Sequence, residues 1–225
     1  MENKNYLMSQ LVFKFPFKIK YYEQDFYVSS NNFSVYKLIE SWPDWPGKWV
    51  NIFGSSGSGK THLSKVLEKK IKNIKLIEAE NINNNIVEDL DHIDCLIIDN
   101  FQSNIDEKLF YSIINQLKQL EKYIVVNTIR PIKEFNFSLK DLQSRLNSFI
   151  NIGIDLPTDE LLKIIISKSF SDKQIKLDPK ICEYIIKNVE RSYEKMFKFL
   201  KDIDELSLST GKSININLIK KAINK

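Results

Sequence analysis

Residues 54 to 61 read Gly-Ser-Ser-Gly-Ser-Gly-Lys-Thr, and this motif restricts the possible folds of the chain more than any other segment. An apolar run from Trp49 to Phe53 leads into it, and a helix-compatible stretch follows. A strand, a Gly-x-x-x-x-Gly-Lys-Thr loop and a helix in this order are typical of phosphate-binding loops. The glycines let backbone N–H groups approach phosphate oxygens, and the helix N-terminus adds partial positive charge. The sequence therefore predicts a nucleotide site.

Each part of the motif has an expected role in binding ADP or ATP. Lys60 would reach the outer phosphates, and the Thr61 hydroxyl would ligate Mg²⁺. The backbone of the preceding residues would surround the phosphate oxygens. The expected nucleotide contacts in this loop are Gly54, Ser55, Ser56, Gly57, Ser58, Gly59, Lys60 and Thr61.

A second motif, Asp94-Cys-Leu-Ile-Ile-Asp99, ends an apolar strand on a carboxylate. A plain buried strand has the same pattern, but after a phosphate loop Asp99 is expected to hold the Mg²⁺ shell. Active ATPases of this type place a second carboxylate at the next position to polarise the attacking water. This chain has Asn100 there, which cannot accept a proton. We therefore expect slow intrinsic ATP hydrolysis.

The composition is that of a globular protein with a buried core. The 225 residues are 43% hydrophobic and 28% charged, with a formal net charge of +4. No apolar run approaches the ~20 residues of a membrane span, and Cys95 and Cys182 lack metal-ligand spacing. These features predict a cytoplasmic protein. The positive charge leaves a DNA-binding surface open, although a solvated exterior rich in lysine explains it more simply.

Strand-like and helix-like segments alternate through the first two thirds of the chain, which predicts a parallel α/β sheet. The expected strands are 49–53, 74–77, 95–98, 123–127 and 149–154. One helix follows the phosphate loop, and the polar segment 81–85 is expected to form a loop. A second helix, over about 106–122, should bury the apolar face formed by Leu109, Ile113, Ile114 and Leu117.

Beyond Pro157 the pattern is helical, with expected helices at 161–170, 178–188, 192–208 and 215–223. Asp178-Pro179 is a typical helix start, and Gly211 is a typical helix end. We therefore predict three parts: an N-terminal arm over 1–20, an α/β nucleotide-binding subdomain over 21–156 and a helical subdomain over 157–225.

Further motifs narrow the class of protein. They are Asp25-Phe-Tyr-Val-Ser29, Asn31, Trp42-Pro-Asp-Trp-Pro-Gly47, Gly57-Ser-Gly-Lys-Thr-His-Leu63, Asn127-Thr128, Asp141-Leu-Gln-Ser-Arg145-Leu146 and Glu190-Arg-Ser192. In this order they resemble the AAA+ class of P-loop NTPases, and within it the DnaA branch. From about Gln10 to Ala222 the chain is similar to the DnaA-homologous regulators called Hda, or HdaA in alphaproteobacteria.

The resemblance implies a five-stranded parallel sheet in the order 5-1-4-3-2, with a C-terminal helical lid. It also implies a negative regulator of chromosomal replication initiation. Such a protein binds DnaA–ATP and the DNA polymerase III sliding clamp, reaches DNA through the clamp, and stimulates hydrolysis of the ATP on DnaA. Assembly of several copies of this chain into a homo-oligomer also stays open. Because the chain ends at Lys225, soon after the lid, we expect no counterpart of DnaA's helix-turn-helix domain.

The resemblance also implies roles for single residues. Arg145 falls at the arginine finger, which inserts beside a neighbour's γ-phosphate and accelerates hydrolysis by ~10³–10⁵; a local surface ion pair is the alternative. Asn127 and Thr128 end the strand from which a polar side chain contacts the γ-phosphate or the attacking water, and either residue is a candidate for this contact. Glu194 stands at the sensor-2 position, where an acid would repel phosphate, and the adjacent Lys195 is the candidate substitute. These departures favour a nucleotide that is held rather than turned over.

The N-terminal segment resembles the clamp-binding peptide of Hda proteins. Its expected clamp contacts are Gln10, Leu11, Phe13 and Phe15, with the two phenylalanines as anchors of a peptide that orders on binding. A first β-strand folded back on the domain is the alternative interpretation. This chain has phenylalanine at a position where Hda proteins usually have leucine. The exchange keeps a bulky apolar side chain there.

Two other functions stay open. One is an independent P-loop ATPase that acts as a helicase loader or a DNA-remodelling adaptor. The other is an AAA+ adaptor that binds DNA through a basic surface. Asn100 argues against the first, and the expected lack of a DNA-reading domain weakens the second.

Overall fold

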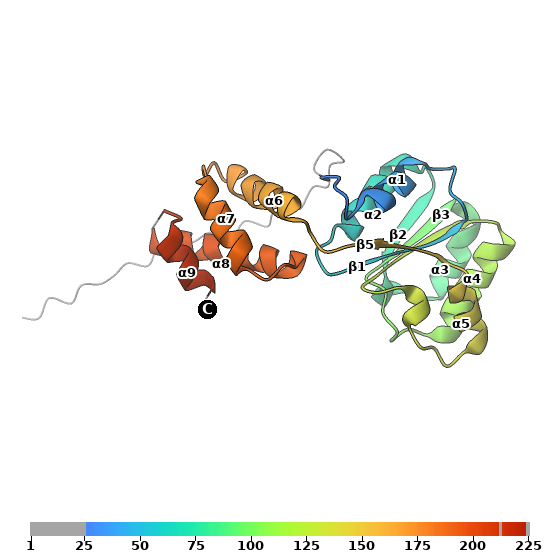
Figure 1. Ribbon diagram of the computed structural model, residues 1–225. Helices are drawn as coiled ribbons and strands as arrows, with labels where there is room; N and C mark the ends of the chain where they lie inside the picture. Colours follow the sequence, from blue (N-terminus) through green and yellow to red (C-terminus); the bar gives the residue numbers. More distant parts are fainter. Residues whose placement is uncertain (1–25, 212, 224–225) are drawn as a thin grey trace, which may run out of the picture. The chain divides into compact units, whose positions relative to one another are not determined.

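The computed structural model describes residues 26–211 and 213–223, which form two compact units divided between Leu156 and Pro157. The first unit is built on a parallel sheet, and the second is helical (Figure 1). The strands are β1 Trp49–Gly54, β2 Ile74–Glu78, β3 Cys95–Asp99, β4 Tyr123–Thr128 and β5 Ile150–Ile154. Their order is β2-β3-β4-β1-β5, with all neighbours parallel. The expected order 5-1-4-3-2 is the same order read from the other edge, so that prediction is confirmed.

β3 lies inside the sheet, and all five of its residues are buried. Helices cover both faces of a parallel sheet, so an inner strand is apolar on both sides rather than on one. The register pairs Ile98 with Val126 of β4, and Asp99 with Glu78 of β2. The carboxyl ends of these three strands therefore lie at a common edge of the sheet.

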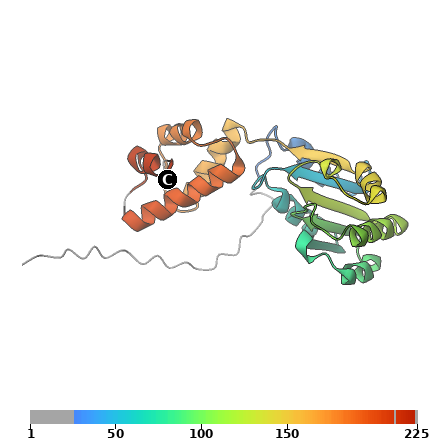
Figure 2. The same ribbon diagram turned by 90° about the horizontal axis from the view of Figure 1, so that it is seen from below.

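The helices of the α/β unit form a layer on each face of the sheet (Figures 1 and 2). One layer consists of α1 Phe33–Glu40 and α2 Lys60–Lys70, which contact each other. The other consists of α3 Asn84–Asp89, α4 Glu107–Gln119 and α5 Lys140–Asn147. Short 3₁₀ helices complete the unit: η2 Ala79–Asn81, η3 Leu90–His92 and η4 Ile132–Glu134. The second layer closes over a core that includes Leu96, Ile98, Phe110, Ile113 and Val126.

The predicted loop at 81–85 is wrong, because α3 begins within it. The side chain of Asn83 accepts a hydrogen bond from the N–H of Asn85 at 3.0 Å, and Ile86 is buried. Asparagine, which signals a turn, here caps a helix. The chain also forms α1, which the sequence analysis did not anticipate.

The buried face of α4 also differs by one position from the expected one. Phe110, not Leu109, is fully buried together with Ile113, Ile114 and Leu117. Leu109 packs against the same core but stays partly exposed. The Phe110 ring lies 4.8 Å from that of Phe101, an aromatic contact that the periodicity of aliphatic residues did not reveal.

The second unit consists of α6 Asp159–Ser171, α7 Pro179–Asn188, α8 Tyr193–Thr210 and α9 Ile216–Ile223, close to the expected helices. They are the orange to red helices in Figures 1 and 2. Thr158, Asp178 and Ser192 cap three of these helices with their side chains. Gly211 ends α8 with φ 63°, a left-handed conformation that favours glycine. The core of the unit includes Leu162, Ile166, Ile185, Met196, Leu200 and Ile219.

The two cysteines of the chain lie in different units, and both thiols are free. Cys95 is completely buried in β3, and Cys182 is buried in α7. Burial raises the pKa of both thiols, and the neighbouring Asp94 carboxylate adds to the effect at Cys95. Within the described residues, no helix is long and apolar enough to span a membrane.

Candidate functional site

The loop from Gly54 to Gly59 joins β1 to α2 and has the shape of a phosphate cradle. Gly59 precedes the helix with φ 98°, a conformation that a residue with a side chain rarely adopts. A Cβ atom on Gly54 would lie 2.9 Å from the Oγ of Ser58 and 3.0 Å from the carbonyl oxygen of Ile154. Both positions therefore require glycine, and the N-terminus of α2 opens into the loop.

Lys60, the first residue of α2, folds back over this loop. Its Nζ donates to the carbonyl oxygens of Gly54 at 2.7 Å and Ser55 at 3.0 Å. Burial lowers the pKa of Lys60, and the Asp99 carboxylate opposes this effect. The amine is held by neutral carbonyls, which an anionic phosphate oxygen can replace with a stronger, charge-assisted bond.

Asp99 lies fully buried at the end of β3. Its Oδ1 accepts from the backbone N–H of Asn100 and from Nδ2 of Asn127, both at 3.0 Å. Its Oδ2 is buried and has no hydrogen-bond partner among the described residues, as is also true of the Ser55 Oγ in the loop. A buried carboxylate oxygen without a donor is a fitting ligand for a hard cation such as Mg²⁺ or for a water bound to it. The residues present therefore fit a nucleotide–metal site.

The structure distinguishes between Asn127 and Thr128, the two polar candidates at the end of β4. The Nδ2 of Asn127 contacts Asp99 and also donates to the Ser64 Oγ at 2.7 Å, so Asn127 joins β3 to α2. The Thr128 hydroxyl instead accepts from Nδ2 of Asn51 at 2.8 Å and donates to the Arg130 carbonyl at 2.6 Å. Only Asn127 belongs to the Asp99 network, because successive side chains of a strand point to opposite faces.

Three residues at this edge were missed by the sequence analysis. Ser64 lies one turn into α2 and accepts the Asn127 bond. Glu78 ends β2 and accepts a hydrogen bond from Nδ2 of Asn100 at 2.8 Å. The Phe26 ring packs against Gly59, where an added Cβ would come within 2.8 Å of it. Glu78 was detectable as the acidic end of a predicted strand, whereas the other two depend on contacts between distant segments.

Arg145 lies away from this edge. It lines a pocket of about 630 Å³ together with Trp49 and Ile150, the first residues of β1 and β5. The phosphate loop follows the opposite end of β1, roughly 16 Å away at ~3.3 Å per strand residue. Arg145 is therefore not among the residues that surround the chain's own phosphate loop.

The remaining predicted nucleotide contact, Lys195, belongs to the other unit. Lys195 and Glu194 lie in the first turn of α8 in the helical unit, where the backbone N–H of Lys195 donates to the Ser192 Oγ at 3.1 Å. The expected nucleotide contact of Lys195 stays a prediction. The expected clamp contacts at 10, 11, 13 and 15 lie outside the described residues.

Solved structures share this arrangement. Domain III of the Thermotoga maritima replication initiation protein DnaA has a TM-score of 0.74 at 19% identity, over 93% of this chain and 98% of that one. AMPPCP-bound DnaA from Aquifex aeolicus has a TM-score of 0.68 at 22% identity, over 86% and 68%. Thermotoga maritima RuvB has a TM-score of 0.63 at 19% identity, over 86% and 67%. At these identities the likeness establishes the fold, which is an α/β P-loop fold followed by a helical unit, as in DnaA and RuvB.

Sequence relatives narrow this class. The family model described as Hda, lid domain, matches residues 159–223, and the one described as RNA helicase matches 50–138. The chromosomal replication initiator protein DnaA of Borrelia turicatae is 30% identical over 258 residues, covering 98% of this chain and 52% of that protein. The chain thus spans about half the length of the curated relatives that it matches. Over nearly its whole length the chain is therefore similar to DnaA, and its residues 159–223 match the lid domain family of Hda.

Proposed function

We propose that the α/β subdomain, residues 21–156, binds ADP or ATP with Mg²⁺, and that residues 157–225 form its lid. Lys60 would exchange its carbonyl partners for phosphate oxygens, while Thr61 and the unpartnered Oδ2 of Asp99 would hold the ion. Mg²⁺ bound there would neutralise charge on the phosphates. The buried network around Asp99 and the cradle at Gly54 support this proposal.

The bound nucleotide is held rather than turned over. Asn100 occupies the position of the second carboxylate, and an amide accepts no proton from an attacking water. Its Nδ2 is bonded to Glu78, the carboxylate that ends the neighbouring strand. Slow intrinsic hydrolysis follows, because Glu78 is tied to the amide side chain of Asn100, the residue that replaces the usual base.

The function that these features support best is regulation of DnaA in trans. The protein would bind DnaA–ATP and stimulate hydrolysis of that ATP, so that it acts as a negative regulator of chromosomal replication initiation. The observation that carries this proposal is the position of Arg145 at the amino end of the strands, away from its own phosphate loop. A guanidinium presented to a neighbour's γ-phosphate stabilises the charge of the transition state.

Docking on the sliding clamp completes the proposal. The arm over 1–20 carries Gln10, Leu11, Phe13 and Phe15, whose pattern of a glutamine followed by spaced apolar side chains suits a peptide that enters a pocket. DNA would then be reached through the clamp, in the cytoplasm.

The test is hydrolysis of radiolabelled ATP bound to DnaA, with DNA-loaded clamp, with and without this protein. We expect acceleration by at least roughly tenfold, which is modest beside the ~10³–10⁵ of known arginine fingers. An unchanged rate, with correct folding and clamp binding verified, would exclude regulation in trans.

An independent P-loop ATPase, acting as a helicase loader or a DNA-remodelling adaptor, is the second candidate. The RNA helicase match over 50–138 and the likeness to RuvB favour it. Under this alternative the isolated protein would hydrolyse ATP at a rate that single-stranded DNA increases and that DnaA leaves unchanged. Phosphate release in those three conditions separates the two functions.

A further inference from the structure

Among the described residues, the side chain of Arg145 has one hydrogen-bond partner, and that partner lies on another helix. The Nε of Arg145, on α5, donates to the Oδ1 of Asn115, on α4, at 3.2 Å. Both residues are half-buried. A guanidinium has five N–H groups, so this bond leaves the four N–H groups of the two terminal nitrogens for another acceptor.

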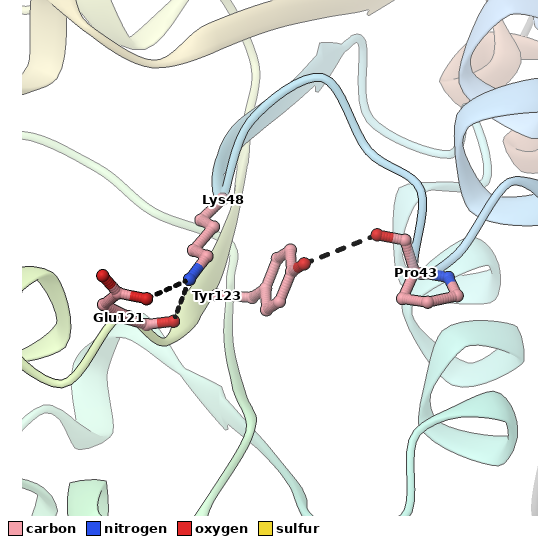
Figure 3. A network of polar contacts seen from close by, with 4 residues as sticks. All are labelled: Pro43, Lys48, Glu121 and Tyr123. Carbon is pink, nitrogen blue, oxygen red and sulfur yellow. Dashed lines mark hydrogen bonds and ion pairs between the residues drawn. The ribbon is translucent and has the colours of Figure 1, made fainter.

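The acceptor is an amide, so the bond orients Arg145 without neutralising its charge. The acid that lines the same pocket is Glu121, and its carboxylate already accepts from Lys48 Nζ at 3.2 Å. Figure 3 shows Lys48 bound to both the carboxylate and the carbonyl of Glu121. Across residues 26–211 and 213–223, Arg145 forms no ion pair. The local ion pair considered from the sequence is therefore absent from this part of the chain.

The surroundings favour an anion at this point. Besides Arg145 and the neutralised Lys48, the pocket of about 630 Å³ is lined by Lys118 and Lys122, and by the hydroxyl-bearing Ser144 and Ser148. Lys122 is paired only loosely, with its Nζ 3.6 Å from the Asp94 carboxylate. The pocket is positively charged, and the Arg145 guanidinium in it is held in place but not neutralised by an acid. Such a pocket suits a phosphate group presented by another molecule.

We propose that Asn115 is a positioning residue for Arg145. By holding Nε, it fixes the plane of the guanidinium so that both terminal nitrogens face a γ-phosphate in the nucleotide site of a neighbouring AAA+ protein. An unrestrained arginine samples many rotamers, so fixing it beforehand raises the fraction of encounters in the productive geometry. This inference rests on the proposed function of Arg145 in trans.

The test is the Asn115→Ala variant in the DnaA–ATP hydrolysis assay. Maximal stimulation should fall roughly tenfold, as for the loss of a hydrogen bond to a charged group. The protein concentration that gives half-maximal stimulation should stay unchanged, because Asn115 orients the guanidinium and does not bind the partner. The control is Asn147→Ala, which removes an exposed amide from the same helix as Arg145. It should stimulate normally, and all variants should keep the wild-type melting temperature.

A double-mutant cycle separates this inference from the proposal beneath it. In single-turnover assays at saturating protein, Asn115→Ala should cause no further loss in the Arg145→Ala background. If Arg145→Ala alone left stimulation intact, the assignment of Arg145 as the finger in trans would be wrong, although the regulation of DnaA would stand. If Arg145→Ala abolished stimulation but Asn115→Ala did not lower it, only the role of Asn115 would be wrong. A further loss in the double variant, or a shift in the half-maximal concentration, would also overturn that role.

Discussion

Nδ2 of Asn100 donates a hydrogen bond to Oε2 of Glu78 over 2.8 Å and so joins the ends of β3 and β2. Asn100 adopts φ 53°, a left-handed conformation that asparagine tolerates better than most residues, and the strand register places Glu78 beside Asp99. The edge of the sheet therefore does have an acid near Asp99, but on the neighbouring strand. An amide occupies the position where active ATPases have their second carboxylate.

This contact predicts that hydrolysis returns only when both residues are exchanged. Asn100→Asp alone would set two carboxylates against each other, and their repulsion would raise the pKa of one of them. The double variant Asn100→Asp with Glu78→Asn reverses the amide–carboxylate contact and places the carboxylate after Asp99. We expect its intrinsic phosphate release to exceed the wild-type rate by roughly tenfold or more, since a positioned base contributes ~10²–10⁴.

Two comparisons give this experiment its controls. Glu80→Gln, at an exposed acid near β2, should leave the rate unchanged. If Asn100→Asp alone hydrolysed ATP as fast as the double variant, the Glu78 contact would have no part in suppressing turnover.

Removal of the Lys60 amine should remove most of the affinity for nucleotide. Lys60→Ala deletes the charged side chain that folds back from α2 over the cradle, and we expect a loss of roughly 100-fold in affinity for ADP and ATP, as for several lost charge-assisted bonds. Titration with a fluorescent nucleotide measures it. Lys65→Ala, on the same helix but paired with Glu68, is the control and should bind normally. Retained affinity in Lys60→Ala would place the nucleotide elsewhere.

The same lysine predicts a pH dependence. Because burial lowers the pKa of Lys60, the free protein loses this charge at a lower pH than an exposed lysine would. Only the protonated amine attracts phosphate, so affinity should weaken as the pH rises through that lowered pKa. An affinity that stayed constant up to the ordinary lysine range would contradict the assigned role of the amine.

Arg145→Ala should remove most stimulation of DnaA–ATP hydrolysis while leaving folding, clamp binding and own-nucleotide affinity intact. Arg145→Lys should restore little, because an ammonium lacks both the planar fork and the Nε that Asn115 holds. A hydrolysis assay measures the stimulation of DnaA, and a nucleotide-binding assay on the same variants measures the affinity for the protein's own nucleotide. Loss of the protein's own nucleotide in Arg145→Ala would show that the residue acts on its own site.

Asn51 should be essential for stability rather than for binding. Its Nδ2 donates to the Val126 carbonyl and to Thr128, and its Oδ1 accepts from the buried N–H of Ile132, all at 2.8 Å. Asn51→Ala leaves these groups unpaired and should lower the free energy of unfolding by about 2–4 kcal/mol. Urea denaturation measures the loss. Asn104→Ala, at an exposed position, should change it by less than about 0.5 kcal/mol. Equal stability of both variants would refute the role of this network.

The N-terminal arm should be separable from the folded units. Replacing Gln10, Leu11 and Phe13 with alanine should eliminate binding to the sliding clamp in a surface-binding assay. The melting temperature and the nucleotide affinity should stay nearly unchanged. A sharp fall in the melting temperature would instead indicate that the segment is a core strand.

The parts of the fold that the sequence predicted are those with strong local signals. The phosphate loop has a fixed spacing, β3 is a continuous apolar run, and the later helices have clear start and stop residues such as Asp178 and Gly211. The order of the strands came from resemblance to a family, since strand order depends on contacts that no local pattern records. α3 was missed because a short run of asparagines is ambiguous between turn and cap.

The candidate site was predictable residue by residue but not as a network. Asp99 and Asn127 could each be chosen as polar strand ends, yet their mutual contact depends on register. The choice between Asn127 and Thr128 required knowing which side of β4 faces α2. The partners Ser64 and Asn115, and the contact of Glu78 with Asn100, were beyond reach, because each bond joins residues that are at least 22 positions apart in the sequence.

The placement of one buried thiol in each unit gives the protein a built-in pair of unfolding probes. A thiol reagent reacts with the exposed thiolate, so Cys95 can be labelled only when β3 separates from its neighbours, and Cys182 only when α7 leaves its core. Mass spectrometry of tryptic peptides distinguishes the two sites without any engineered label. Native-state labelling with and without nucleotide would therefore report separately how strongly a ligand holds each half of the chain closed.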